Sequence, residues 1–209
     1  MTQTSGFAPH WEKIMVSLTK GQSVSLEKRG GGGLTRIIMG LGWDVAKKKG
    51  FLGGLIGGGA GGDIDLDAPC VLFDANRELV DTVWFRQLSS VDGSVVHTGD
   101  NRSGAGDGDD EQIKVDLARV PASVQTLVFV VNSFTGETFA KIENATCRIV
   151  DETTGEETAR YDLSGSGSHT AQVMAKVTRT GSGWTMTAIG EVASGRTFND
   201  LMPAIKRSL

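Results

Sequence analysis

The feature that most constrains the fold is a succession of short extended runs, separated by turn residues, that begins at Met15. In Ala171–Val177 the odd positions are small or β-branched and apolar, which is the two-residue period of a strand with one buried face. Residues 127–131 are apolar throughout and suit a central strand, whereas 151–155 and 180–183 are rich in turn formers. The sequence therefore predicts an all-β protein, a β-sandwich of two antiparallel sheets.

Helical periodicity appears only at the C-terminus. Residues 199–209 predict a short helix in which Asn199 is the candidate N-cap and Pro203 lies close enough to the first turn to be tolerated. At the other end, Val16–Leu18 and the run around Val24 are joined by a Lys20-Gly21 turn, so we expect them to form a hairpin.

The length of 209 residues suits one domain, expected at 15–209. Residues 1–14 lack the pattern that follows and are predicted to be an N-terminal extension. Residues 46–62 form a glycine-rich insertion. Its residues 57–62 fit GxGxxG, but strand-like sequence follows them instead of a helix, so we reject a dinucleotide fold. Basic residues 47–49 beside apolar residues 51–56 suggest a membrane or partner surface, and the alternative is a flexible linker.

Composition excludes several classes of protein. With 21 basic and 25 acidic residues the net charge is −4, so there is no electrostatic footprint for nucleic acid. No apolar run approaches the roughly 20 residues of a membrane span, and no signal-peptide or lipid-anchor pattern is present, so we expect a cytoplasmic protein. Cys70 and Cys147 lie in strand-like runs and are expected to be buried thiols without a redox role.

The densest chemical feature is an acidic segment, residues 97–111, with the sequence HTGDNRSGAGDGDDE. Between Asp100 and Glu111 it holds five acidic residues and one arginine, a net charge of −4 that equals the charge of the whole chain. Its glycines allow the backbone to fold carboxylates and carbonyls around a point, as a hard cation with about 6 to 8 oxygen ligands requires. The alternative is a solvated acidic turn.

A second acidic element, DIDLD, spans residues 63–67. On a strand, Asp63, Asp65 and Asp67 share one face while Ile64 and Leu66 face the core, and three carboxylates on one face favour a counter-cation. The element is not an EF-hand loop, because Ala68 stands where that motif needs glycine. Oxygen ligands without clustered cysteine or histidine indicate Ca²⁺ or Mg²⁺ instead of zinc. Asp44, after Gly42-Trp43, is a further candidate.

Six segments together resemble the TerD family of tellurite-resistance and general-stress proteins over residues 15–189: VSLTKGQSVSLEK (16–28), GLGWD (40–44), DIDLDAP (63–69), SVDGSVVHTGDNRSGAGDGDDE (90–111), VDLARVP (115–121) and ARYDLS (159–164). The resemblance implies a calcium-binding β-sandwich linked to stress resistance, without an established catalytic activity. It also implies partners among other members of the stress system, including a membrane-embedded component, and a location at the inner face of the membrane. Carried over by motif, the calcium ligands are Asp65, Asp67, Asp100, Asn101, Asp107, Asp109, Asp110 and Glu111, with Asp44 and Asp63 as additional candidates.

Two other functions stay open. A metal-dependent hydrolase of phosphate esters would use the acidic segment with an aspartate or His97, three residues before Asp100, as base. No nucleophile motif such as GxSxG appears. A calcium-independent structural subunit of an assembly would use the same fold without binding metal. Binding without catalysis is the function that we expect.

Overall fold

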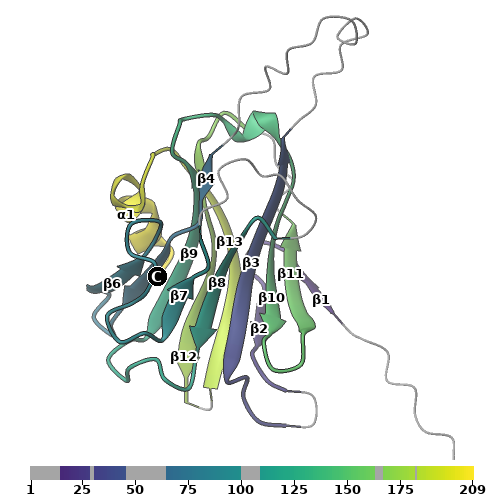
Figure 1. Cartoon of the computed structure of the whole chain (residues 1–209), viewed down its shortest axis with the longest axis vertical. Helices are drawn as coiled ribbons and strands as arrows, with labels where there is room; N and C mark the ends of the chain where they lie inside the picture. The colour runs from purple at the N-terminus through teal and green to yellow at the C-terminus, as the bar shows by residue number, and fades with distance from the viewer. Residues whose placement is uncertain (1–14, 29–30, 46–64, 100–108, 163–166, 182) are drawn as a thin grey trace, which may run out of the picture.

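The computed structural model describes residues 15–28, 31–45, 65–99, 109–162, 167–181 and 183–209. Over these residues two β-sheets pack face to face, and one helix follows at the C-terminus (Figure 1). The predicted all-β sandwich with a short C-terminal helix is confirmed. The chain also contains a short 3₁₀ turn, η1 (Phe139–Lys141).

The first sheet, sheet A, has six strands, in the order β1 (Val16–Leu18), β11 (Glu156–Asp162), β10 (Ile142–Asp151), β3 (Arg36–Val45), β8 (Glu111–Asp116) and β7 (Val95–His97). Its neighbours pair antiparallel except β1 and β11, which are parallel. Sheet A is therefore mixed because of one edge strand.

The second sheet, sheet B, is antiparallel, in the order β2 (Ser23–Ser25), β13 (Gly183–Ala193), β12 (Ala171–Thr180), β9 (Thr126–Ser133), β5 (Cys70–Phe73) and β6 (Leu79–Val83). The short strand β4 (Leu66–Asp67) pairs with β9 beyond the end of β5. β4 and β5 are thus separate strands, and Pro69, which has no N–H to donate, lies between them.

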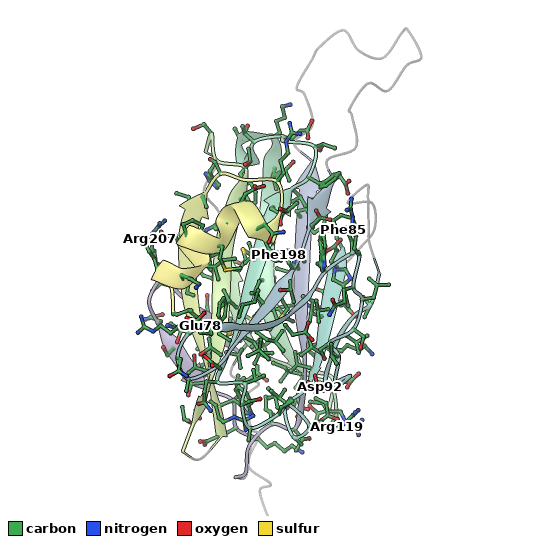
Figure 2. The ribbon with its side chains drawn as sticks, turned by 90° about the vertical axis from the view of Figure 1, so that its left-hand side faces the viewer. Glu78, Phe85, Asp92, Arg119, Phe198 and Arg207 are labelled. Atoms are coloured by element: carbon green, nitrogen blue, oxygen red, sulfur yellow. The ribbon has the colours of Figure 1, made fainter. Side chains whose placement is uncertain are left out.

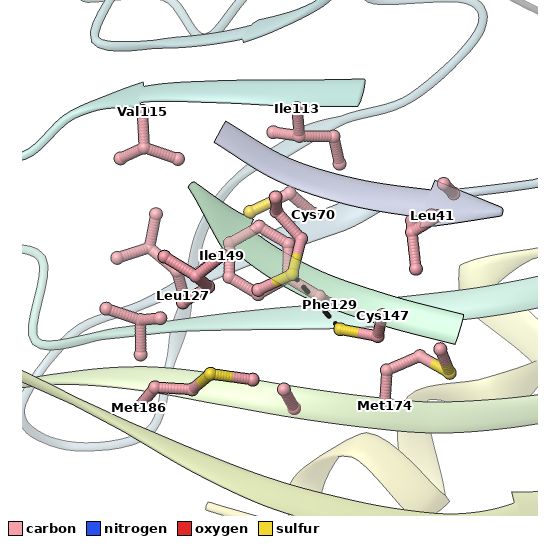
Figure 3. Close-up of a cluster of buried hydrophobic side chains, with 14 of the residues drawn as sticks. Leu41, Cys70, Ile113, Val115, Leu127, Phe129, Cys147, Ile149, Met174 and Met186 are labelled. Atoms are coloured by element: carbon pink, nitrogen blue, oxygen red, sulfur yellow. Dashed lines mark hydrogen bonds between the residues drawn. The ribbon is translucent and has the colours of Figure 1, made fainter. Parts of the chain in front are cut away.

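The main core lies between the sheets. Leu127 and Phe129 of β9 pack there against residues of sheet A such as Ile113 and Ile149 (Figure 3). Cys147 of β10 is also buried, with its thiol 3.1 Å from the sulfur of Met39. Burial, together with the charge of Asp109, raises the pKa of the Cys147 thiol to about 12, and burial likewise raises the pKa of Cys70. The expectation that both cysteines are buried is confirmed.

A second core lies on the outer face of sheet B, under helix α1 (Phe198–Arg207). Leu201 and Ile205 cover Val128 and Val130 of β9 there, and Figure 2 shows the helix lying across this face. Both faces of β9 are thus buried, as its uninterrupted apolar run predicts. The expectation that 171–177 is half-buried is wrong for 171–175, because α1 covers Ala171 and Val173 on the outer face while Met174 lies in the main core, and the strand register shifts between Val173 and Ala175.

Two local predictions are also wrong. β1 and β2 do not form a hairpin, since β1 pairs with β11 in sheet A and β2 pairs with β13 in sheet B. The helix is capped by Thr197, and Asn199 lies within it. The carboxylate of Asp200 accepts hydrogen bonds from the backbone N–H groups of Arg196 (2.9 Å) and Thr197 (3.1 Å).

The predicted extension at 1–14 and the glycine-rich insertion at 46–62 lie outside the described residues. Among the residues described, no helix has the length and apolar character needed to cross a membrane.

Candidate functional site

Parts of both acidic elements lie at one end of the sandwich. The C-terminal end of β3, the N-terminal end of β8 and the short strand β4 meet there (Figure 1). Leu41 of β3 is paired in register with Glu111 of β8, and Leu66 of β4 lines a small cavity together with Leu41 and Trp43. The fold therefore brings residues 65–67 and 110–111, which are far apart in the sequence, to neighbouring elements.

Asp110 is bound to β3 through both its backbone and its side chain. Its N–H donates to the carbonyl oxygen of Leu41 at 2.7 Å, and its Oδ2 accepts the N–H of Trp43 at 2.8 Å. These two contacts extend the pairing of β8 with β3 by one residue and fix the carboxylate beside the GLGWD strand. The backbone of Asp44 continues β3 from this point, and its side chain lies outside the part of the structure that is described.

Asp109 has different surroundings, although it precedes Asp110 directly. Its two oxygens accept Nε and Nη2 of Arg148 at 2.7 and 3.1 Å, and Oδ2 also accepts Nε2 of Gln112 at 3.0 Å. Only 4% of the Asp109 side chain is exposed. The hydrogen bond to Asp109 is the main cause of a raised pKa at Arg148, so the guanidinium keeps its charge.

The ion pair continues along the outer face of sheet A. Arg148 also donates from Nη1 to Glu157 at 3.0 Å, and Glu157 accepts two hydrogen bonds from Arg160, at 2.7 and 3.1 Å. Burial disfavours the charged form of Glu157, but the hydrogen bonds from Arg160 and Arg148 outweigh it and lower its pKa. The result is a line of alternating charges, Asp109, Arg148, Glu157 and Arg160, that begins before β8, passes over β3 and continues on β10 and β11.

Glu111 faces the interior of the sandwich. Its Oε2 lies 3.2 Å from Nε2 of His97, and the two side chains are 0% and 1% exposed. The N–H of Gly99 points at Nδ1 of His97 at 3.2 Å, so Nδ1 accepts and Nε2 carries the proton donated to Glu111. Both ring nitrogens of His97 are thus engaged within the sandwich, and its side chain is only 1% exposed, so it does not face a surface where a substrate could bind.

Residues 65–67 lie on the sheet B side of the same end. Leu66 is buried in the main core, as expected. Asp67 is also buried, at 6% exposure, and its Oδ2 accepts Nδ2 of Asn132 at 3.2 Å. Asn132 donates in addition to the carbonyl of Arg196, and its buried Oδ1 has no hydrogen-bond partner within the described chain. Asp65 precedes β4, and its carbonyl accepts the N–H of Phe134 at 3.1 Å.

The remaining predicted ligands, Asp63, Asp100, Asn101 and Asp107, lie outside the described residues. Within the described ranges, no three histidine, cysteine or acidic side chains gather closely enough to hold a metal ion. A larger cavity, of about 460 Å³, has a lining that includes Val16, Val24 and Asp151, and none of the predicted ligands lines it.

Sequence reasoning missed several residues at this end. Arg148 lies between the buried residues Cys147 and Ile149 on β10, which indicates an outward side chain but not its partner. Glu157 lies in a run of half-buried residues at the start of β11, where alternation gives no such indication. Asn132 follows an apolar run, and nothing in the sequence around it indicates a contact with Asp67. Gly40 belongs to the GLGWD motif, to which the sequence assigns no structural role. In the structure the carboxylate of Asp109 lies directly over Gly40.

Known proteins are similar to this chain in sequence and in fold. Residues 14–203 match the TerD domain. The chain is 53% identical over 187 residues to the tellurium resistance protein TerZ of Serratia marcescens, which covers 90% of this chain and 95% of that protein. It is 39% identical over 197 residues to the stress response protein SCP2 of Bacillus subtilis (strain 168), with 90% of this chain and 98% of that protein covered.

A solved structure, titled a homologue of telluride resistance protein (TerD) from Streptomyces coelicolor A3(2), superposes with a TM-score of 0.62 at 21% identity. The superposition covers 78% of this chain and 92% of that chain, and it shows the same fold. The family that the sequence motifs indicate is therefore confirmed by both sequence and fold, and the chain belongs to the TerD domain family.

Proposed function

We propose that this chain is a calcium-binding module of a stress response that acts through calcium-dependent protein interaction. The observation that carries the proposal is the meeting of residues 65–67 and 110–111 around Leu41 and Trp43 at one end of the sandwich. The acidic segment from Asp100 to Asp107 joins the fold at this end, because Asp109 and Asp110 follow it directly.

The chemistry of the donors supports calcium. Asp65, Asp67, Asp110 and Glu111 offer only oxygen, as does the buried Oδ1 of Asn132. Asp67 and Glu111 are almost fully buried, and burying carboxylates is costly unless charge or hydrogen bonds compensate. Calcium accepts oxygen ligands in flexible geometry, so donors from two elements and a glycine-rich segment suit it better than magnesium. We assign the ligands to these four residues together with Asp100, Asn101 and Asp107.

The proposed action is binding without catalysis. Calcium would neutralise the acidic end and order a surface there for a partner. Relatives named for tellurium resistance and stress response support a stress-related role. The partners we propose are other proteins of the same stress system, including a membrane-embedded component, with this chain in the cytoplasm or at the inner face of the membrane.

The test is thermal unfolding of the full chain in EDTA, in Ca²⁺ and in Mg²⁺. Binding at a hundredfold excess over Kd stabilises the native state by about 2.7 kcal/mol, so calcium should raise Tm well above the value in magnesium. Asp110→Asn should remove most of this shift. Asp92→Asn, which makes the same charge change at an exposed turn away from the acidic end (Figure 2), should keep it.

No shift in the unmodified protein would refute calcium binding. A mass in solution that depends on protein concentration but not on calcium would then favour the structural subunit. Turnover of phosphate esters that Asp110→Asn abolishes would favour the hydrolase.

A further inference from the structure

We propose that Arg148 is the positioning residue of the acidic end: its guanidinium holds Asp109 against sheet A and thereby fixes the attachment of Asp110. The proposal rests on the calcium-binding function proposed above. It assigns Asp109 to anchoring and leaves metal ligation to its neighbours.

The contact between the two side chains is two-pronged. Nε and Nη2 of Arg148 donate to the two oxygens of Asp109, at 2.7 and 3.1 Å. The planar fork of a guanidinium matches a carboxylate in this way, and a lysine ammonium does not. Because 96% of the Asp109 side chain is buried, its carboxylate has little water to compensate for a lost partner.

Position 40 provides the space for this carboxylate. A Cβ atom at Gly40 would lie 2.2 Å from Oδ2 and 2.5 Å from Oδ1 of Asp109, closer than atoms approach in proteins. The carboxylate therefore lies directly over the β3 backbone, which only glycine permits. This explains the first glycine of the GLGWD motif, a feature that the proposed function left without a role.

Arg148 is itself oriented from its other side. Nη1 donates to Glu157 at 3.0 Å, and Glu157 is held in turn by Arg160. All three guanidinium nitrogens are thus engaged, two with Asp109, which precedes β8, and one with Glu157 of β11. The guanidinium is held in place before any metal arrives, and it fixes the residue next to Asp110.

Two consecutive residues, Asp109 and Asp110, are each attached to a strand of sheet A. Asp109 is bound to Arg148 of β10, and Asp110 is bound to Leu41 and Trp43 of β3. Freeing Asp109 would loosen the contacts of Asp110 with β3. Calcium binding would then have to order this residue, and the entropy lost in ordering it would weaken the affinity. Partners that orient metal ligands commonly change metal affinity by about 10- to 100-fold.

The direction of the effect separates positioning from simple charge. If Arg148 acted only as a positive charge near the site, its removal would tighten calcium binding, because repulsion would fall. If it positions Asp109 and Asp110, its removal weakens calcium binding. Arg148→Lys keeps the charge and loses the fork, so any loss of affinity in that variant reports on geometry.

The experiment is a calorimetric titration of the full chain with CaCl₂, comparing the unmodified protein with Arg148→Gln, Arg148→Lys, Asp109→Asn and the double variant Arg148→Gln/Asp109→Asn. We expect each single variant to bind calcium roughly tenfold more weakly, and the double variant to be no weaker than either single one. Arg36→Gln is the matched control, since Arg36 pairs with Asp116 on the same face of sheet A, away from Asp109, and should bind as the unmodified protein does.

Tighter binding by Arg148→Gln, or a double variant restored to the original affinity, would show a charge effect and overturn the proposal. If Asp109→Asn binds calcium more weakly while both Arg148 variants bind it as the unmodified protein does, Asp109 is a ligand and the proposal is overturned.

A second measurement needs no calcium. In EDTA, the backbone amides of Asp110 and Trp43 should exchange with deuterium severalfold faster in Arg148→Gln and Arg148→Lys than in Arg36→Gln. Unchanged exchange would overturn the anchoring role. If the unmodified protein fails to bind calcium, the proposed function fails, and the exchange rates still decide whether Arg148 anchors Asp110.

Discussion

Glu157 lies between two guanidinium groups, and its charge is one source of stability for the outer face of sheet A. Burial disfavours its ionised form, but hydrogen bonds from Arg160 and Arg148 outweigh burial and bring its pKa below the ordinary value of 4.5. A carboxyl whose pKa is lower in the folded than in the unfolded state adds stability above the unfolded pKa. That stability is lost as the pH falls through the folded pKa.

We therefore predict that Glu157→Gln lowers the free energy of unfolding by about 1 to 2 kcal/mol at pH 7. The deficit should shrink below about pH 4.5, where the unmodified protein loses the same charge. Urea unfolding at pH 7, 5.5, 4 and 3 measures the difference. Glu156→Gln, at the preceding position of β11, is the control and should change stability little, because Glu156 makes no ion pair with the described residues. A deficit that stays constant down to pH 3 would contradict the prediction.

At the same scale, Asp109 and Asp110 show why the candidate site could be predicted only in outline. Both are acidic residues of one motif, so their spacing and composition assign them the same role. In the structure they point to different partners, Arg148 of β10 and Trp43 of β3. That division depends on the order of the strands in sheet A, in which β3 lies beside β8 and β10 lies beyond β3, and the local sequence does not indicate this order.

At the scale of the element, helix α1 depends on a cap that involves Asp200. Its carboxylate accepts the backbone N–H groups of Arg196 and Thr197, which are also the main cause of its lowered pKa. An acidic group here also interacts favourably with the N-terminal end of the helix dipole. Because Leu201 and Ile205 cover the outer core of sheet B, loosening this first turn costs stability of the whole domain.

We predict that Asp200→Ala lowers the free energy of unfolding by about 0.5 to 1 kcal/mol. Asn199→Ala should be neutral or slightly stabilising, because Asn199 is exposed within the helix and alanine is the better helix former. Denaturant unfolding of both variants measures the two changes in the free energy of unfolding. The reverse order would mean that the helix begins at Asn199, as the sequence pattern alone predicts.

The elements themselves could largely be predicted, whereas their partners could not. Strands appear where alternating or uninterrupted apolar runs predict them, including β9 and β12. Alternation indicates that one face is buried but not against which sheet. β1 and β2 therefore read as a hairpin although the turn between them carries the chain from sheet A to sheet B. For the same reason β12 is predicted to have only one buried face, although α1 covers Ala171 and Val173 and the main core contains Met174.

At the scale of the whole molecule, sheet B lies between two hydrophobic cores. β9 and β12 are central strands of that sheet, with β9 buried against both sheet A and α1. Their amides should exchange with solvent only when the whole domain unfolds. The exposed turn at 152–155, between β10 and β11, is closed mainly by local hydrogen bonds to Asp151 and should exchange through local opening.

This difference predicts how calcium binding would change the amide exchange rates in each part of the molecule. A ligand that binds only the native state raises the free energy of unfolding, so the amides of β9 and β12 should all slow by one common factor that matches the gain in stability. Amides near Asp110 should also slow, because opening there would release the metal. Those of Thr153 and Gly155 should not change, since their opening leaves the acidic end intact. Hydrogen exchange followed by mass spectrometry, with EDTA and then with calcium, measures all three groups. Equal slowing at the 152–155 turn and at the acidic end would contradict a local site, because it would require calcium to stiffen the sandwich along its full length.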